Sequence, residues 1–257
     1  MPVRTKKESD QILSIDVGGT SIKACILSSI GDLKSEFKKI ATPKDSKPEA
    51  IIKVISELVD QLDDEFDRIS IGFPGYVRGG IVYTAPNLAK NKWVQIPFAQ
   101  QVSNLLGRPV RLINDADQQA LGVVGGEGFE IVLTVGTGFG TALVYDGELL
   151  PHFELAHFPV SKTKDYDDYI GTKALDKIGK KDWNDRLEQI IQTYKTVFNY
   201  DTLYIGGGNS KHITIELDHN IKLVTNKDGI KGGAKLWEVA EKYHVYTTLP
   251  EKTSEDE

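Results

Sequence analysis

The chain has 257 residues, 40% of them hydrophobic, and a formal net charge of −6 at pH 7. This length suffices for one large globular domain or two ordinary ones, and the negative charge argues against nucleic acid or an anionic membrane as a general partner, because both require a broad basic surface. No apolar run approaches the ~20 residues of a membrane span, and none follows the charged N-terminus, so we expect a cytoplasmic location. The single cysteine, Cys25, excludes a disulfide framework and a cysteine-rich zinc site, and its apolar neighbours predict a core position.

The first part of the chain is typical of a three-stranded meander followed by α/β structure. Residues 12–16 and 21–27 predict strands joined by a glycine turn, and 33–41 predicts a third strand. The segment SKPE at 46–49 resembles a capping box, and it precedes a helical spacing of apolar residues that continues to Leu62. A strand over 68–73, a helix ending at Gly107 and a strand over 109–114 follow.

The second part repeats the opening pattern. After a helix that begins at Asp115, two strands surround a glycine turn within 129–145, and Asp146-Gly147 closes the next hairpin. A charged connection (161–182), a long helix (182–198), a strand from 201 and a final helix (about 230–246) complete the chain. We therefore expect an α/β protein with a small lobe over 11–112, on which the final helix packs, and a large lobe over 113–229. The ranges 1–10 and 247–257 are expected to be flexible termini.

The repeated glycine turns are the most informative feature. The segments "DVGGTSIKACI" and "TVGTGFGTALV" each place a glycine–threonine turn between two strands. Glycine lets backbone amides approach an anion closely, and the threonine hydroxyl adds a donor. A single glycine hairpin is more often only a hairpin, but two with matched flanks indicate a clasp for a phosphate chain.

Seven segments in order carry a resemblance to a known family: "DVGGTSIK", "GFPG", "TAPNL", "LINDADQQALG", "TVGTGFGTAL", "ELAH" and "YIGGGNSK". Together they closely resemble the ROK family of sugar kinases, and most of all its polyphosphate glucokinase branch. The resemblance spans about residues 12–212 and implies the actin-like ATPase (ribonuclease H-like) fold, with two lobes and mixed sheets. It further implies phosphoryl transfer from polyphosphate, ATP or both to a hexose hydroxyl, with glucose as the expected acceptor, magnesium as cofactor and a homodimer.

On the donor side, the resemblance implies that two turns and a glycine loop contact the phosphates. Asp16 would hold magnesium, through water or directly, or orient the transferred group, although an Asx turn is an equal alternative. Lys23 would neutralise phosphate if it points to the cleft, or else be an ordinary solvated lysine. The loop 206–208 is the adenosine-side turn in ATP-using relatives, or a plain strand-to-helix turn. The expected donor-side residues are Asp16, Gly18, Gly19, Thr20, Lys23, Thr137, Gly138, Gly140, Gly207 and Gly208.

On the acceptor side, the resemblance makes Asp115 the catalytic base that accepts the proton of the attacking hydroxyl; the alternative is a helix N-cap. Asn87 and Asn114 would hydrogen-bond sugar hydroxyls, for which an amide offers both donor and acceptor, although lone asparagines are more often turn residues. The "ELAH" segment supplies Glu154 and His157 as further sugar-binding residues. One more sugar-binding carboxylate is expected among Asp165, Asp167 and Asp168, with Asp165 favoured.

The sequence departs from the family at three points. Ala156 stands where the family usually has glycine, and Val123 stands where glutamate often follows "LG", with no derivable consequence. The family's zinc-binding cysteine cluster after His157 is missing, so no zinc is expected, and this favours the polyphosphate branch. The remaining histidines show no metal-site spacing and are read as surface or packing residues: His152, His212, His219 and His244.

Three questions stay open at this point. The acceptor could be another hexose or an amino sugar, with ATP as the donor. A non-catalytic sugar-binding ROK protein is a second alternative, although regulators of this type carry an added helix-turn-helix and only about a dozen residues precede the first strand. Polyphosphate would need a basic track despite the net charge of −6. The candidates for it are Lys90, Lys92, Lys162, Lys164, Lys180, Lys181 and Lys211.

Overall fold

The computed structural model describes residues 10–242 and 245–251, and the chain divides into two compact units. The first holds the described residues up to Gln118 and from Ile230 onward; the second holds Gln119–Gly229. The boundary lies inside helix α3 (Asp115–Val123), whereas the sequence placed it ahead of this helix, at residue 112. Among the described residues, no helix is both long and apolar enough to cross a membrane.

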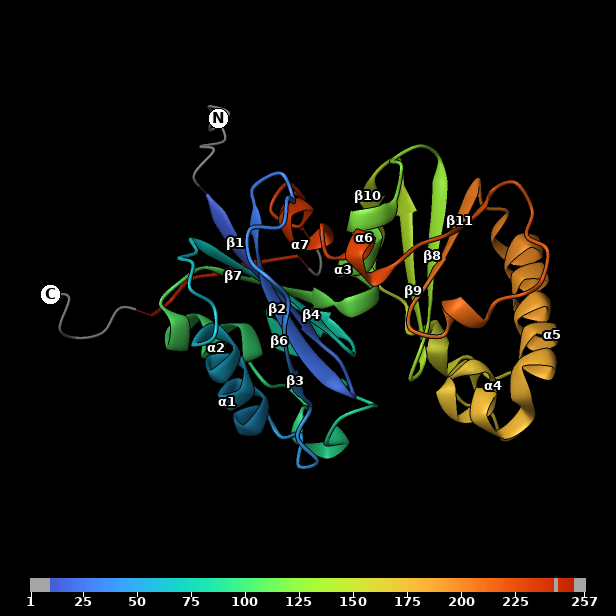
Figure 1. Cartoon of the computed structure of the whole chain (residues 1–257), viewed down its shortest axis with the longest axis horizontal. Coiled ribbons are helices and arrows are strands. Elements are labelled where there is room, and N and C mark those ends of the chain that lie inside the picture. Colours follow the sequence, from blue (N-terminus) through green and yellow to red (C-terminus); the bar gives the residue numbers. More distant parts are fainter. Residues whose placement is uncertain (1–9, 243–244, 252–257) are drawn as a thin grey trace, which may run out of the picture. The chain divides into compact units, whose positions relative to one another are not determined.

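A mixed sheet with the strand order β13-β7-β4-β1-β2-β3 forms the centre of the first unit (Figure 1). Strands β1, β4 and β7 run parallel, and the other pairings are antiparallel. The strands of this unit are β1 (Gln11–Val17), β2 (Ser21–Ser28), β3 (Lys38–Ala41), β4 (Arg68–Phe73), β5 (Val77–Arg78), β6 (Ile81–Val82), β7 (Val110–Asn114) and β13 (Thr247–Thr248). Its helices, besides the start of α3, are α1 (Pro48–Val59), η1 (Lys90–Lys92), α2 (Phe98–Leu106) and α7 (Gly232–Lys235).

Side-chain alternation along β1 gives this sheet two different faces. Leu13, Ile15 and Val17 belong to the main core, which is completed by α1 and α2, neighbours in Figure 1. Ile12 points the other way and packs with Cys25 against the C-terminal segment. Cys25 is therefore a core residue, as predicted, and burial raises the pKa of its thiol to about 12.

The C-terminal segment is held on the sheet by Arg111 rather than by a long helix. The Arg111 guanidinium donates to the carbonyls of Leu236 (2.6 Å) and Val239 (2.9 Å) and lies 4.8 Å from the centre of the Trp237 ring. These contacts hold a segment that forms turns, rather than a continued helix, after Lys235. The helix expected over about 230–246 is therefore wrong, and only the four-residue α7 forms.

The expected flexible tail is also wrong at its start. Thr247 and Thr248 form β13, which pairs antiparallel with β7, and the Thr247 hydroxyl accepts a hydrogen bond from Arg111 Nε (2.9 Å). The ranges 1–9 and 252–257, which complete the two expected flexible termini, lie outside the described residues.

Local signals were partly correct. Gly107 ends α2 in the left-handed conformation (φ 63°), as predicted. The capping box at 46–49 does not form, because the N-cap of α1 is Lys47 and no side chain caps this end of the helix. The Ser46 carbonyl accepts the indole N–H of Trp93 (2.8 Å). Pro48 begins the helix instead, where its missing N–H costs nothing.

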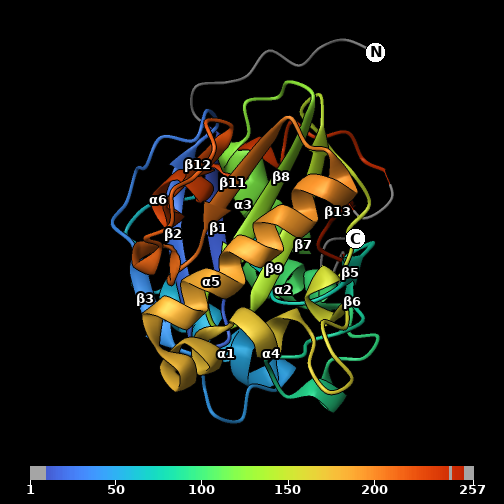
Figure 2. The same ribbon diagram turned by 90° about the vertical axis from the view of Figure 1, so that its right-hand side faces the viewer.

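The second unit is a mixed sheet with the strand order β10-β9-β8-β11-β12. Its strands are β8 (Phe129–Val135), β9 (Phe139–Tyr145), β10 (Glu148–Leu149), β11 (Thr202–Gly206) and β12 (Ile221–Leu223), and its helices, besides the rest of α3, are η2 (Leu155–His157), α4 (Tyr166–Ile170), α5 (Thr172–Phe198), η3 (Ser210–His212) and α6 (Asn226–Gly229). Figure 2 shows α5 running across β8, β9 and β11. Trp183 and Leu187 on its inner face are buried in the core of this unit. Helix α5 starts ten residues before the predicted helix, and Gly179 (φ 81°) interrupts it.

Candidate active site

In the first unit, the turn between β1 and β2 is a compact loop fixed by its own backbone. The N–H of Gly18 donates to the carbonyl of Ser21 (3.0 Å), and the Thr42 hydroxyl donates to the carbonyl of Gly18 (2.6 Å). A Cβ on Gly18 would lie 2.8 Å from the Ser21 carbonyl oxygen, so only glycine fits without a shift of backbone. On Gly19, a Cβ would lie 3.4 Å from the side chain of Asn87, which places these two predicted residues side by side.

Asp16, the residue expected to hold magnesium, forms an ion pair with the predicted phosphate ligand Lys23. The two residues face each other in the β1–β2 register, and Lys23 Nζ lies 2.9 Å from Asp16 Oδ2. Magnesium keeps several waters and commonly takes only one or two protein carboxylates. Asp16, whose side chain is 32% exposed and has one oxygen engaged by Lys23, therefore fits contact with a hydrated ion. Among residues 10–242 and 245–251, no cluster of three or more His, Cys, Asp or Glu residues could hold a metal ion.

Asp16 and Asp115 are brought to the same region of the sheet by strand register. Asp16 pairs with Gly72 on β4, and Gly72 pairs with Ile113 on β7. Since neighbouring strands lie ~4.8 Å apart, the backbone of Asp16 is about 10 Å from that of Ile113. A Cβ on Gly72 would lie 3.2 Å from the Cα of Asp115, so this glycine lets the start of α3 lie close to the sheet.

The start of α3 separates the roles of Asn114 and Asp115. Asn114 Oδ1 accepts the N–H groups of Ala116 (2.7 Å) and Asp117 (3.3 Å), and its Nδ2 donates to the carbonyl of Gly75 (3.1 Å). Asn114 is therefore the capping residue of α3, a role that the sequence considered for Asp115. The Asp115 carboxylate accepts only one of these N–H groups, that of Ala116 (2.9 Å). Asn114 was also predicted to bind sugar, and its side-chain amide would then have to serve both the cap and the sugar.

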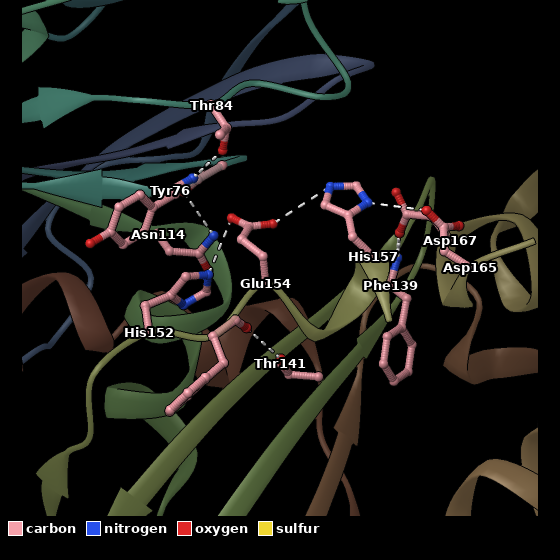
Figure 3. Close-up of polar contacts among 12 residues, drawn as sticks. Tyr76, Thr84, Asn114, Phe139, Thr141, His152, Glu154, His157, Asp165 and Asp167 are labelled. Carbon is pink, nitrogen blue, oxygen red and sulfur yellow. Dashed lines mark hydrogen bonds and ion pairs between the residues drawn. The ribbon is translucent and has the colours of Figure 1, made fainter. Parts of the chain in front are cut away.

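The "GFPG" and "TAPNL" segments meet beside Asn114. A Cβ on Gly75 would overlap the Thr84 carbonyl oxygen, and the N–H of Tyr76 donates to the Thr84 hydroxyl (2.8 Å). Figure 3 draws these contacts within the first unit. The loop that carries the predicted sugar ligand Asn87 is thus tied to the loop that Asn114 holds.

In the second unit, two segments far apart in the sequence hold the turn between β8 and β9. The carbonyl of Gly136 accepts hydrogen bonds from the N–H and hydroxyl of Thr172 (both 2.8 Å) and from Asn209 Nδ2 (3.0 Å). Gly207 has φ 90°, and a Cβ there would lie 2.4 Å from the carbonyl oxygen of Val135. The predicted donor-side residues of the turn and of the glycine loop therefore do lie together.

Asp167 anchors the far side of this turn. Its Oδ1 accepts the N–H of Phe139 (2.6 Å), and a Cβ on Gly138 would lie 2.6 Å from the same oxygen. Burial raises the pKa of Asp167 above its ordinary value, although the hydrogen bond from Phe139 opposes the rise. Gly140, which was predicted with the phosphate ligands, lies inside β9 opposite Thr134 rather than in the turn.

Glu154, His157 and Asp165 form a polar chain in the second unit (Figure 3). Glu154 Oε2 lies 3.9 Å from His157 Nε2, and His157 Nδ1 lies 3.1 Å from Asp165 Oδ2. Because an ionised carboxylate only accepts hydrogen bonds, Nδ1 of His157 carries the proton. Burial raises the pKa of Asp165, but hydrogen bonds from the Asp168 N–H and from His157 outweigh it, and the pKa lies below its ordinary value.

Sequence reasoning missed His152, which belongs to the same chain of contacts. Its side chain is only 4% exposed, and its Nε2 lies 3.3 Å from Glu154 Oε1. The reading of His152 as a surface or packing residue left out this role. A signal was present, because residues two apart in an extended segment point to the same side, and His152 stands two residues before Glu154.

Two lysines of the expected basic track lie near enough to His212, the last residue of η3, for their charges to act on it. The charges of Lys180 and Lys211 add to burial, which is the larger cause, in lowering the pKa of His212. The arrangement is fixed by the buried Asn184, whose Nδ2 donates to the carbonyls of Lys180 (2.8 Å) and His212 (3.0 Å). Of these residues, Lys211 and His212 follow closely after the glycine loop in the sequence, whereas Lys180 belongs to α5.

Comparison with known proteins identifies the family. Residues 12–153 match the sequence model described as the ROK family. A polyphosphate glucokinase of Mycobacterium leprae (strain TN) is 29% identical over 225 residues, which cover 83% of this chain and 67% of that protein. The inorganic polyphosphate/ATP-glucomannokinase structure from Arthrobacter sp. strain KM has a TM-score of 0.79 and 29% identity, covering 88% of this chain and 97% of that one.

A more distant structure supports the fold alone. The ROK family glucokinase from Streptomyces griseus, in complex with glucose and AMPPNP, has a TM-score of 0.71 at 20% identity and covers 88% of this chain and 98% of that one. The expected two-lobe α/β fold of the actin-like ATPase class is confirmed by these structures. Since the family match spans more than half of its length, the chain belongs to the ROK family.

Proposed function

We propose that the chain is a sugar kinase that transfers a phosphoryl group from polyphosphate, and also from ATP, to the 6-hydroxyl of glucose. The observation that carries the proposal is the 29% identity with a polyphosphate glucokinase over 225 residues, a stretch long enough to draw on both units. The residues expected for the chemistry agree with it. The first unit gathers Asp16, Asn87 and Asp115 on neighbouring segments, and the second gathers Glu154 and His157.

In the proposed reaction, Asp115 accepts the proton of the sugar hydroxyl. The hydroxyl oxygen forms a bond to the terminal phosphorus of the donor, while the bond from that phosphorus to the leaving phosphate oxygen breaks. A general base must lie within hydrogen-bond reach of the proton that it takes. Asn114 supports this role because it already caps α3, so the Asp115 carboxylate is not needed for the cap.

The acceptor sugar is proposed to bind Glu154 and His157. Since His157 Nδ1 donates to Asp165, its Nε2 faces Glu154 and can accept a hydrogen bond from a sugar hydroxyl. Glu154 accepts from a second hydroxyl and is steadied on its other oxygen by His152. Asn87 is a further proposed sugar ligand through its side-chain amide.

The donor phosphates are proposed to lie against the two glycine turns. Bound magnesium would bridge phosphate oxygens and neutralise their charge, and Asp16 would meet its water shell. Lys180 and Lys211 favour polyphosphate as a donor, because a long polyanion gains from cations beyond its terminal phosphates. A triphosphate held mainly by turn amides has less need of them.

The test is a product assay on the purified full-length chain. Glucose, mannose and N-acetylmannosamine are each supplied with ATP or with long-chain polyphosphate at fixed magnesium, and the sugar phosphate is identified by mass. We expect glucose 6-phosphate from polyphosphate, with a second activity from ATP. ATP activity without polyphosphate activity would overturn the donor assignment, and a preference for another sugar would overturn the acceptor.

Three further arms sharpen this assay. Activity should disappear with a chelator and return with magnesium but not with zinc. The rate with polyphosphate at limiting donor should fall more steeply with salt than the rate with ATP, by analogy with counterion release from nucleic acids.

If the chain binds glucose but transfers phosphate to no sugar, it is a non-catalytic sugar-binding protein. Light scattering tests the expected homodimer.

A further inference from the structure

Helix α4 makes contacts on two sides of the second unit through carboxylates that are two residues apart. Asp165, its N-cap, accepts from His157 Nδ1 (3.1 Å), and Asp167, in its first turn, accepts the N–H of Phe139 (2.6 Å). Figure 3 shows both contacts, one toward the histidine and one toward the start of β9. One short helix therefore touches a predicted sugar ligand and the predicted phosphate turn.

The contact between α4 and the turn is tight enough to transmit a displacement. Asp167 Oδ1 lies 2.6 Å from the position that a Cβ on Gly138 would take, so the turn has little room to approach α4 without moving this side chain. The ring of Tyr166 packs on that of Phe139 with centroids 5.2 Å apart. Close-packed groups of this kind move together, because interiors have little free volume.

The C-terminal end of α4 holds the same turn. The N–H of Gly171 donates to the Asp167 carbonyl (3.1 Å), and a Cβ on Gly171 would lie 2.7 Å from the carbonyl oxygen of Thr137. The next residue, Thr172, donates twice to the carbonyl of Gly136. The turn is therefore in contact with α4, with its C-cap Gly171 and with the first residue of α5.

We infer that Asp167 is a positioning residue that couples sugar binding to donor binding. A sugar hydroxyl bound at His157 changes the hydrogen bond between the imidazole and Asp165, and α4 shifts in response. Asp167 moves with α4, and Phe139 and the turn amides move with Asp167. This inference rests on the proposed function, since it assumes that His157 meets the sugar and the turn meets the donor. Such coupling is reciprocal, so the donor must tighten sugar binding by the same factor.

The test is a binding cycle by calorimetry with probes that do not react. 6-Deoxyglucose stands in for the acceptor because it lacks the hydroxyl that would be phosphorylated, and tripolyphosphate and magnesium AMPPNP serve as donors. In the wild-type chain we expect 6-deoxyglucose to lower the donor Kd about 5-fold or more, within the usual range of coupling. In Asp167→Ala this factor should fall to within about twofold of unity, whereas Asp167→Asn, whose amide oxygen still accepts from Phe139, should retain most of it.

Two more variants keep the outcome decisive. Asp165→Ser preserves a helix cap, but the serine side chain is too short to reach His157, so this variant should also lose the coupling between sugar and donor. It tests the coupling through α4 if Asp167→Ala does not fold. Asp176→Ala, which removes an exposed carboxylate from α5, is the matched control and should keep the wild-type factor.

The possible failures differ from one another. If Asp167→Ala weakens donor binding equally with and without 6-deoxyglucose, Asp167 is merely structural and the coupling inference is overturned. If the wild-type chain binds both probes without mutual effect, the inference fails while the proposed function stands. A wild-type chain that phosphorylates no sugar and binds neither probe overturns the proposed function as well.

Discussion

The β1–β2 turn of the first unit and the β8–β9 turn of the second begin from nearly the same sequence pattern but are stabilised in different ways. In both, three residues separate the two strands. The N–H of Gly18 bonds to the carbonyl three residues on, whereas the N–H of Gly136 bonds to the carbonyl only two residues on. The first turn is held mainly by its own backbone and Thr42, and the second by side chains from distant segments.

The strand ends before the two turns differ in charge. Asp16 stands two residues before the first glycine of its turn and pairs with Lys23, while Thr134 stands at the same place in the second unit and pairs with Gly140. The same backbone pattern therefore carries an ion pair in one unit and no charge in the other. The comparison teaches that the repeated backbone pattern does not fix the charge at the strand end, which is an ion pair in the first unit and a neutral residue in the second.

The largest effect is expected at Asp115. Asp115→Asn should lower kcat by about 10²–10⁴-fold, the usual contribution of a general base, because an amide cannot take the proton. Unfolding temperature should stay within about 2 °C of wild type, because Asn114 caps α3. Steady-state kinetics with glucose and thermal melts provide the check. A fall in kcat of less than tenfold, or ~1.4 kcal/mol in the barrier, would show that Asp115 is not the base.

Asp16→Thr makes the first strand end resemble the second. We expect kcat to fall about 10- to 100-fold, because an interaction of a charged group contributes ~1.5–3 kcal/mol, and the magnesium concentration for half-maximal rate should rise. The matched control is Thr134→Val in the second unit, which keeps the shape of the neutral position. If both variants lose activity to the same extent, the distinction between a charged and a neutral turn is wrong.

The glycines of the two turns should respond differently to a second mutation. Gly18→Ala and Gly138→Ala should each destabilise the chain by about 1–3 kcal/mol, the usual cost of overpacking. For Gly138 the obstacle is the Asp167 side chain, so Asp167→Ala should relieve the loss; for Gly18 it is the backbone of Ser21, and no side-chain change can relieve it. Denaturant titrations of the single and double variants measure this. Additive losses in Gly138→Ala/Asp167→Ala would remove the difference.

Acid pH should give the smallest effect. The pKa of Asp165 lies below its ordinary value in the folded chain, so its stabilising contribution is complete above the unfolded pKa of about 3.8 and is lost as the pH falls through the folded pKa. Asp165→Asn should therefore melt slightly lower than wild type at pH 7, and the difference should begin to shrink only as the pH falls below about 3.8. A difference that is constant from pH 7 to pH 3 would mean that the ionised carboxylate does not matter.

The sequence predicted much of the local structure because its signals act over short distances. Glycine turns, alternating strands and the Gly107 helix end were recognised from neighbouring residues alone. The capping box at 46–49 did not form, because α1 starts one residue later, with Lys47 as its N-cap. The final helix also did not form, and a residue far along the chain holds this segment instead: Arg111 on β7 donates to the carbonyls of Leu236 and Val239.

The candidate site was predicted residue by residue, but its internal connections were not. Sequence patterns brought out Glu154 and His157, yet they could not show that His152 steadies Glu154 or that Asp167 supports the turn at Phe139. These contacts depend on how α4 is folded back onto β9, which no local periodicity records. The choice of Asp165 as a sugar-binding carboxylate stays a prediction, and both of its oxygens accept hydrogen bonds from the protein.

The clamp of Arg111 on the C-terminal segment also has a consequence for synthesis. In the sequence, the second unit, Gln119–Gly229, is inserted between the two parts of the first unit. Arg111 and β7 therefore have no partners until Leu236, Val239 and β13 have been synthesised. The N-terminal part of the chain emerges from the ribosome first, yet it lacks one edge strand and one covered face of its sheet until nearly the whole chain is translated. The inserted unit has all of its strands earlier, so it can become the first folded body, in reverse of the usual N-terminal-first order.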